Sequence, residues 1–450
     1  MNNLMFGAAL LSSLIAHGSH AAPSPDEHCA AGVYELADGR VIDIGHAKDG
    51  LRWRMPDGRN GVLATQGATE RLTSTRGRTG KADGHLVSLR CADEWIQFDA
   101  AEGHRIDLVQ QDVTFRSGDV ELVGRLVLPS GTGRVPVVVE IHGSETTSAL
   151  RYNAWQRMLP ASGVGVFVYD KRGTGASGGE YTQDFHVLAA DAAQAARKVR
   201  RLGGGRISAL VYAGASQGGW VAPLAQAIEP ADRVIVSYGL TVSPLEENRS
   251  QVQQELATKG YSGADLIAAG EVTDATGELM ASGFRDGFAA YAAAYKRYHS
   301  APWFKELRGE FTGDIAAYSP LLLRIAAPIA RRRSARGTPW RHQPLPVLSA
   351  VDVPIMWVLA GDDAEAPPAQ TRDDLLELQK GGREITLLEF PGTDHGMVEF
   401  ELDTAGKRVA TREAQGYFQA VADFARTGQL SKAAYGNARR TEAKVRREAE

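Results

Sequence analysis

The sequence predicts an α/β fold: a doubly wound, mostly parallel sheet with a helical cap insertion and a small N-terminal all-β domain. Continuous apolar runs at residues 135–141, 164–169 and 207–213 are typical of strands buried on both faces. Helical patterns such as residues 187–202 alternate with these runs, which favours a parallel sheet covered by helices. The alternation stops between residues 244 and 346, where apparent helices rich in aromatic residues predict an insertion over the carboxyl edge of the sheet.

The size and composition of the chain are those of a globular protein. Its 450 residues predict roughly two to three domains, and 43% hydrophobic and 23% charged residues are ordinary values. The net charge of −4 and the pI near 6.3 give no reason to expect nucleic-acid binding. No run of about 18 or more apolar residues follows the N-terminus, so we expect no transmembrane segment in the mature chain.

The N-terminus has the pattern of a secretory signal peptide. Residues 4–16 are apolar, and small residues precede a cleavage position after Ala21. Residues 1–3 carry no Lys or Arg, which departs from that pattern, and a buried N-terminal helix is the alternative. We expect residues 1–21 to be removed and the protein to be periplasmic or secreted.

Residues 26–108 predict the small all-β domain. Short alternating runs are separated by turn signals, and the pairs Asp38-Gly39 and Asp57-Gly58 indicate hairpins. We expect a β-sandwich or a barrel. Cys29 and Cys91 are the two cysteines of the chain, and in an exported protein they suggest a disulfide that staples this domain. Two unrelated buried thiols are the alternative.

Residues 109–428 predict the α/β domain, which opens with antiparallel strands. Apolar runs at residues 353–359 and 384–390 resume the sheet after the insertion, and residues 412–426 predict a closing helix. Residues 429–450 form a polar tail of mixed charge, for which we expect a frayed helix or disorder.

The stretch from Gly214 to Gly218 has the pattern G-x-S-x-G between a predicted strand and a predicted helix. Small residues must flank the Ser in such a turn because its backbone angles are strained. The turn lifts the Ser216 hydroxyl out of the sheet and places the next N–H, that of Gln217, at a helix N-terminus, where it can stabilise an oxyanion. A glycine-rich turn with a chance Ser is the alternative.

A nucleophilic Ser needs a base, and the base needs an acid that orients it. Two loops after predicted strands supply candidates: residues 359–368 contain several acids, and residues 390–396 contain His395. Loops at the carboxyl ends of strands meet at one edge of an open sheet. Ser216, an acid and His395 can therefore come together there.

The order of these motifs is similar to that of the α/β-hydrolase superfamily. From about residue 113 to 428 the chain resembles secreted bacterial relatives of the serine aminopeptidases and of dienelactone hydrolase-like esterases. The matching residues are His142-Gly143-Ser144, Asp170 through Gly178, Gly214 through Gly218, Gly361 through Pro368 and Asp394-His395-Gly396. The resemblance leaves the β domain and the substrate unexplained.

The resemblance implies roles for individual residues. Ser216 is the expected nucleophile and His395 the expected general base. The backbone N–H groups of Gln217 and Ser144 are the expected oxyanion hole, and we interpret His142 as a structural residue of the same loop. No cofactor is implied, and the sequence has no Cys/His cluster or H-E-x-x-H motif that would predict a metal site.

The resemblance assigns the acid less directly. The family's acid loop runs Gly-x-x-Asp-x-x-Val-Pro, and here it is one residue short. Alignment from the prolines selects Asp363, whereas counting from the glycine reaches Ala364, which cannot serve. Asp362 and Glu365 are the alternatives to Asp363. Asp394 is adjacent to His395 in sequence and is poorly placed to bond its ring, so we interpret Asp394 as a loop cap.

A basic cluster lies in the insertion; it consists of Arg331, Arg332, Arg333, Arg336 and Arg341. One interpretation is a solvated face. The other is a site for acidic substrates or for anionic envelope surfaces.

We predict a serine hydrolase that cleaves ester bonds of small or medium acyl substrates through an acyl intermediate on Ser216. A peptidase that acts on short peptides or envelope peptide links is the alternative, because its triad chemistry is the same. An acidic pocket in the insertion, for example around Glu246, Glu247 or Glu255, would favour an aminopeptidase. A non-enzymatic envelope binding protein that kept the fold is a third interpretation.

Overall fold

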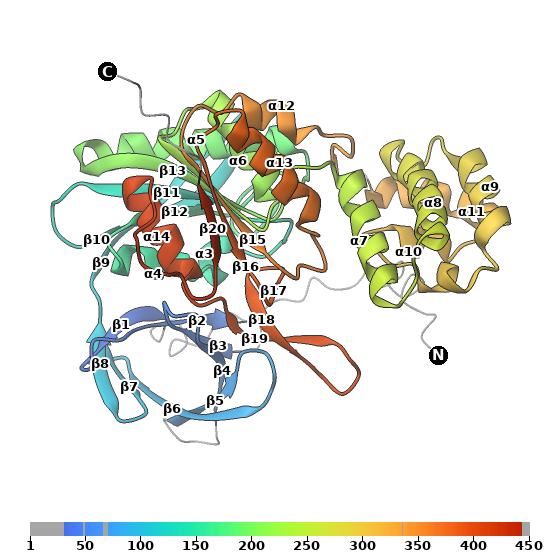
Figure 1. Cartoon of the computed structure of the whole chain (residues 1–450). Helices are drawn as coiled ribbons and strands as arrows, with labels where there is room; N and C mark the ends of the chain where they lie inside the picture. The colour runs from blue at the N-terminus through green and yellow to red at the C-terminus, as the bar shows by residue number, and fades with distance from the viewer. Residues whose placement is uncertain (1–30, 48–49, 66–70, 335, 443–450) are drawn as a thin grey trace.

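The computed structural model describes residues 31–47, 50–65, 71–334 and 336–442. Figure 1 shows an N-terminal barrel, a central α/β domain and a helical cap that extends to one side. The expected signal peptide lies outside the described residues, and so does Cys29, so the Cys29–Cys91 disulfide stays a prediction. Within the described ranges, none of the helices has the length and apolar character needed to cross a membrane.

The N-terminal part is a closed antiparallel barrel. Its strands are β1 (Gly32–Leu36), β2 (Val41–Ala47), β3 (Gly50–Arg54), β4 (Asn60–Thr65), β5 (Arg71–Arg76), β6 (Ala82–Arg90), β7 (Trp95–Phe98) and β8 (Ala101–Arg105). Large side chains fill the interior, and the rings of Trp53 and Phe98 meet there at 5.0 Å between centroids. Trp53 donates its indole N–H to Ser74 Oγ at 2.6 Å, which satisfies this buried polar atom. The predicted all-β region is confirmed, and the pairing of β1 with β8 makes it a barrel.

The central domain is built on one mixed sheet with the strand order β20-β16-β15-β14-β13-β11-β12-β10-β9. The strands are β9 (Leu108–Ser117), β10 (Val120–Pro129), β11 (Val135–Ile141), β12 (Gly165–Tyr169), β13 (Ile207–Ala215), β14 (Arg233–Ser237), β15 (Ile355–Ala360), β16 (Ile385–Phe390) and β20 (Arg439–Glu442). The neighbours among β11 to β16 pair in parallel, whereas β9, β10 and β20 pair antiparallel. The predicted fold class, a doubly wound and mostly parallel sheet, is confirmed.

Helices cover both faces of the sheet because successive strand residues point to opposite sides. Val137 and Val139 of β11 belong to one core cluster, and Val138 belongs to the other. The first cluster packs against α5 (Phe185–Gly203), α6 (Gly218–Ile228), α12 (Pro344–Ser349) and α13 (Ala369–Lys380). The second packs against α3 (Ala149–Tyr152), α4 (Trp155–Ala161) and α14 (Tyr417–Thr427).

The polar tail after α14 differs from the expectation of a frayed helix or disorder. Strand β20 adds to the edge of the sheet by pairing with β16. Tyr435 is 5% exposed and packs into the core, and its hydroxyl donates to Asp423 at 2.7 Å. A short polar edge strand has the composition of a loop, so no sequence pattern distinguishes it. Residues 443–450 lie outside the described part.

The cap interrupts the sheet between β14 and β15, as expected for the insertion (Figure 1). Its helices are α7 (Pro244–Thr258), α8 (Ala264–Ala281), α9 (Phe288–Tyr298), α10 (Thr312–Ala316) and α11 (Pro320–Ser334), with a 3-10 turn at Pro302–Glu306. The cap has its own core, in which Phe284, Tyr291, Trp303 and Phe311 are buried. The predicted helical cap insertion is confirmed.

A small antiparallel sheet joins the α/β domain to the barrel. It consists of β17 (Thr393–Asp394), β18 (Val398–Leu402) and β19 (Arg408–Glu413). The Glu413 N–H donates to the Gly58 carbonyl at 2.9 Å, and the Arg78 N–H donates to the Ala410 carbonyl at 2.8 Å. His395 lies between β17 and β18, so the barrel supports the chain segment that carries His395.

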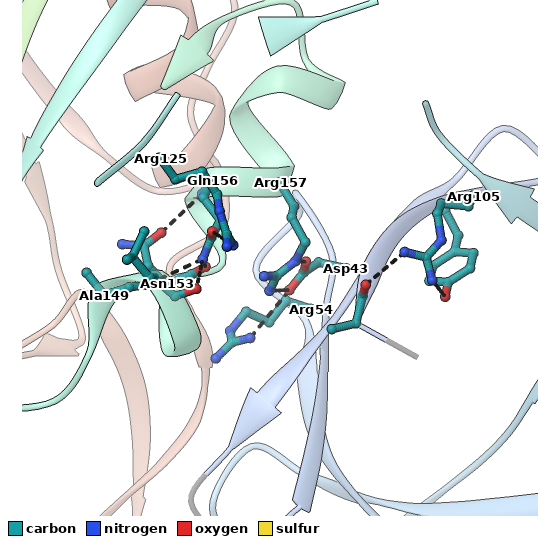
Figure 2. Close-up of polar contacts among 11 residues, drawn as sticks. Asp43, Arg54, Arg105, Arg125, Ala149, Asn153, Gln156 and Arg157 are labelled. Carbon is teal, nitrogen blue, oxygen red and sulfur yellow. Dashed lines mark hydrogen bonds and ion pairs between the residues drawn. The ribbon is translucent and has the colours of Figure 1, made fainter. Parts of the chain in front are cut away.

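Asp43 of the barrel makes the buried ion pair between the two domains (Figure 2). Its carboxylate accepts hydrogen bonds from Arg157 of α4 at 2.5 and 3.1 Å and from Arg54 of β3 at 3.5 Å. The Asp43 side chain is 0% exposed, and those of Arg157 and Arg54 are 14% and 15% exposed. Removing one partner of such a pair leaves a buried charge without compensation.

We expect Asp43→Ala to lower the free energy of unfolding by about 3–5 kcal/mol, because Arg157 and Arg54 would keep their charges in a poorly hydrated interface. Urea unfolding measures the change. Asp274→Ala is the matched control, since Asp274 pairs with Arg249 on the surface and its side chain is 62% exposed. Equal unfolding midpoints for Asp43→Ala and wild type would contradict this role for Asp43.

Candidate active site

Ser216 occupies a strained turn between β13 and α6. Its φ angle is +52°, in the left-handed region that a side chain rarely adopts. A Cβ atom on Gly214 would lie 2.1 Å from the Gly218 carbonyl oxygen, and one on Gly218 would lie 2.1 Å from that of Ile141. Both glycines of the G-x-S-x-G pattern are therefore required by close backbone contacts. The Ser216 N–H donates to the Ser237 carbonyl at 3.0 Å and anchors the turn to β14.

The structure brings Ser216, His395 and Asp363 together at the carboxyl edge of the sheet. His395 Nε2 lies 3.1 Å from Ser216 Oγ, and His395 Nδ1 lies 2.9 Å from Asp363 Oδ2. Asp363 is 1% exposed, and its second oxygen accepts the N–H groups of Glu365 at 2.9 Å and Ala366 at 2.7 Å. These bonds hold the carboxylate in one orientation toward the imidazole.

The other acids near His395 have different partners. Asp362 accepts the Gly392 N–H at 2.7 Å. Asp394 accepts the Ala364 N–H at 2.9 Å and pairs with Arg408 at 2.8 Å. Asp362 and Asp394 thus tie the acid loop to the His395 loop, and neither bonds the imidazole. Among the expected candidates, Asp363 has the geometry of the orienting acid.

The loop that contains Ser144 lies against Ser216. A Cβ atom on Gly143 would be 3.2 Å from the Ser216 Cβ, so a side chain at this position would crowd Ser216. His142 bonds the Tyr169 carbonyl through Nε2 at 2.9 Å and has the structural contact expected of it. Gln217 is the N-cap residue of α6, so its N–H belongs to a free helix terminus beside Ser216.

Lys171 and Tyr181 hold the same loop, and sequence reasoning did not single them out. Lys171 Nζ donates to the Gly143 carbonyl, and the Tyr181 hydroxyl donates to the Ser144 carbonyl. A trans peptide points its C=O and its N–H in opposite directions, so fixing the Gly143 carbonyl also fixes the Ser144 N–H. Lys171 is 3% exposed, and burial lowers its pKa to about 8. The Asp-Lys-Arg-Gly run places Lys171, but nothing in the pattern reveals what it bonds.

Acids of the cap and of the acid loop surround the imidazole. Glu247 of α7, Glu310 and Glu365 all interact electrostatically with His395, and the Glu365 carboxylate lies 3.7 Å from Nε2. Burial, and then repulsion from Glu310, raises the pKa of Glu247 well above its ordinary value. Of the other acids considered in the insertion, Glu246 caps α7 through Ser243. Sequence reasoning did not identify Glu310, because no local pattern marks it.

The pKa of His395 is raised to about 9. Burial alone would lower it, but the hydrogen bond and negative charge of Asp363, together with the charges of Glu365 and Glu247, outweigh that effect. The ring of Tyr238 packs edge-on against the imidazole at 4.9 Å between centroids and helps to exclude water. Tyr238 directly follows β14, and sequence reasoning did not single it out. Within the described part of the chain, no group of three or more His, Cys, Asp or Glu side chains is placed to hold a metal ion.

Asp363→Asn is expected to lower kcat for any acyl substrate by about 10³–10⁴, because an amide at this position favours the wrong imidazole tautomer. Asp394→Asn is the matched control; it leaves the His395–Asp363 bond in place and should retain most of the activity. Steady-state kinetics of the two variants measure the difference. A higher kcat in Asp363→Asn than in Asp394→Asn would show that Asp363 is not the acid that orients His395.

The raised pKa of His395 predicts an alkaline pH dependence. A base must be neutral to accept a proton, so kcat/KM for an uncharged ester should rise with pH and level off above about 9. Glu365→Gln removes a negative charge near Nε2 and should lower the apparent pKa, whereas Glu399→Gln on β18 should not. Assays of a short-chain ethyl ester in a pH-stat measure the profiles. An unchanged profile in Glu365→Gln would contradict the electrostatic origin of the shift.

Several solved structures are similar to this chain at low sequence identity. No curated protein shows a match to the chain. Among solved structures, the acylaminoacyl peptidase of Pyrococcus horikoshii is 16% identical over 81% of this chain and 52% of its own, with a TM-score of 0.40. An esterase of Pyrococcus furiosus is 13% identical over 64% and 84%, with a TM-score of 0.40. The proline iminopeptidase of Mycobacterium smegmatis is 18% identical over 63% and 91%, with a TM-score of 0.38.

A family model described as the alpha/beta hydrolase family matches residues 138–412, which is more than half of the chain. The matched segment contains Ser216, Asp363 and His395. The chain therefore belongs to the alpha/beta hydrolase family.

Proposed function

We propose that this protein is a serine hydrolase that cleaves ester bonds of small or medium acyl substrates. The observation that carries the proposal is the continuous hydrogen-bonded chain from Asp363 through His395 to Ser216, with Ser216 on a left-handed turn. A hydroxyl bonded to an oriented imidazole is the arrangement that nucleophilic catalysis by Ser requires.

The residues have the following roles in the proposed reaction. Ser216 Oγ attacks the acyl carbon as His395 Nε2 takes its proton, and the N–H groups of Gln217 and Ser144 stabilise the oxyanion, each by about 3 kcal/mol. Protonated His395 then gives its proton to the departing alcohol, which leaves an acyl ester on Ser216. Water attacks this ester with His395 again as base, and the acid is released. Asp363 keeps Nδ1 protonated and stabilises the imidazolium.

A fluorophosphonate probe tests nucleophile activation without knowledge of the natural substrate. We expect the probe to label wild type and to leave Ser216→Ala unlabelled, and hydrolysis of p-nitrophenyl butyrate to fall by about 10⁴ or more in Ser216→Ala. Ser237→Ala is the matched control, because Ser237 is near the turn but bonds it through its backbone. Equal ester hydrolysis by wild type and Ser216→Ala would reject the proposal.

A peptidase that recognises a free amino terminus is the second candidate. The acids Glu247, Glu310 and Glu365 around His395 favour it, because together they would attract a protonated amine close to the scissile bond. Such a substrate would also oppose the burial and the repulsion from Glu310 that raise the pKa of Glu247.

Matched substrates separate the two candidates. An esterase should hydrolyse butyrate esters faster than alanyl p-nitroanilide, and Glu247→Gln should not change the butyrate rate greatly. A peptidase should prefer alanyl p-nitroanilide to its N-acetylated form, and Glu247→Gln should raise KM for the free amine alone. Glu271→Gln on the outer surface of the cap is the control variant.

A further inference from the structure

Helix α11 presents an apolar face to solvent. Leu321, Leu322, Ile325 and Ile329, which we call the α11 face, are 70%, 54%, 67% and 53% exposed. Leu321, Ile325 and Ile329 are four residues apart and so lie in one row along the helix, with Leu322 beside them. A soluble protein rarely leaves such a row of large aliphatic side chains uncovered.

The opposite side of α11 already fills the cap core, so the orientation of the helix is settled. Leu323 and Ala327 are each 4% exposed and pack with the buried aromatic residues of the cap. Arg331 donates two hydrogen bonds to the Phe284 carbonyl, at 2.7 and 3.0 Å, and fixes the end of the helix. A rotation that buried the α11 face would expose this core, so the face needs an occupant from outside the cap.

Helix α11 itself carries basic side chains beside this face. Arg324, Arg331 and Arg332 of α11 are exposed. Neither α9 nor α11 contains an Asp or Glu. On α9, Arg297 is directed toward α8, where it pairs with Glu271 at 3.4 Å. Figure 1 shows α9 and α11 together at the end of the cap farthest from the sheet.

We propose that the α11 face docks on an anionic phospholipid surface. The aliphatic side chains enter the boundary between headgroups and acyl chains, and the arginines bind lipid phosphates. The composition is that of an interfacial helix, aliphatic with a basic rim, and it lacks the Trp and Tyr residues that dominate protein interfaces. This docking is independent of the proposed reaction. Of the basic cluster it involves Arg331 and Arg332, whereas Arg336 stacks on Tyr181 and Arg341 pairs with Glu278.

A second copy of the chain is a less suitable occupant. A two-fold contact through this face would set the arginines of one copy against the same arginines of the other. The repulsion between them would have no compensating acid on α9 or α11. On an anionic surface, lipid phosphates pair with these arginines and the lipid covers the aliphatic side chains.

Sedimentation with lipid vesicles tests the proposal on the purified protein. We expect wild type to bind vesicles of phosphatidylcholine mixed with phosphatidylglycerol, and to bind about tenfold less to phosphatidylcholine alone or in high salt. L321Q/I325Q should lose most of the binding and keep the wild-type unfolding midpoint, because both side chains are exposed. I228Q/L402Q is the matched control, since Ile228 and Leu402 are 44% and 63% exposed elsewhere on the surface.

A second variant tests the charge component separately. R324Q/R332Q should lose the preference for phosphatidylglycerol and retain weak binding to both vesicles. Equal binding of L321Q/I325Q and wild type would overturn the proposal, and so would equal binding of wild type to both vesicle types. Light scattering provides the third check. If wild type is a dimer that does not bind vesicles, and L321Q/I325Q is a monomer, the α11 face belongs to a contact with a second copy and the proposal is overturned.

Discussion

The left-handed backbone of Ser216 is the constraint on which the rest of the site depends. A side chain at φ +52° is tolerated because Gly214 and Gly218 let the strand, the turn and helix α6 approach one another within backbone contact. The same turn presents the hydroxyl to His395 and leaves the Gln217 N–H at the start of α6. A bulkier residue at either glycine would open the turn and separate the Ser216 hydroxyl from His395.

The loops that meet Ser216 are held by partners from distant parts of the chain. The acid loop and the His395 loop are bonded to each other through Asp362 and Asp394, and the hairpin after His395 rests on the barrel. The Asp43 ion pair fixes that barrel on α4. Ser216, Asp363 and His395 all lie outside the barrel, yet the barrel restricts the movement of the segment that carries His395.

The cap combines two surfaces with different chemistry. Toward the sheet it brings Glu247 and Glu310 to His395, where their charges help to set the pKa of the imidazole. Away from the sheet it exposes the aliphatic row of α11 between basic residues. Leu and Ile residues lie both on the buried side of α11 and on its exposed face, so the sequence did not show which side faces the core.

The sequence by itself determined the fold class, the barrel-sized β region, the cap insertion and the positions of Ser216 and His395, because apolar periods, turn residues and motif order are local properties of the chain. Alignment of the acid loop from its prolines selected Asp363 over Asp362 and Glu365, and the tertiary structure places Asp363 Oδ2 at the imidazole. Lys171, Tyr181, Glu310 and the edge strand β20 had to await the structure. Each acts through a contact between segments far apart in sequence, and the geometry of such a contact exists only once the chain has folded.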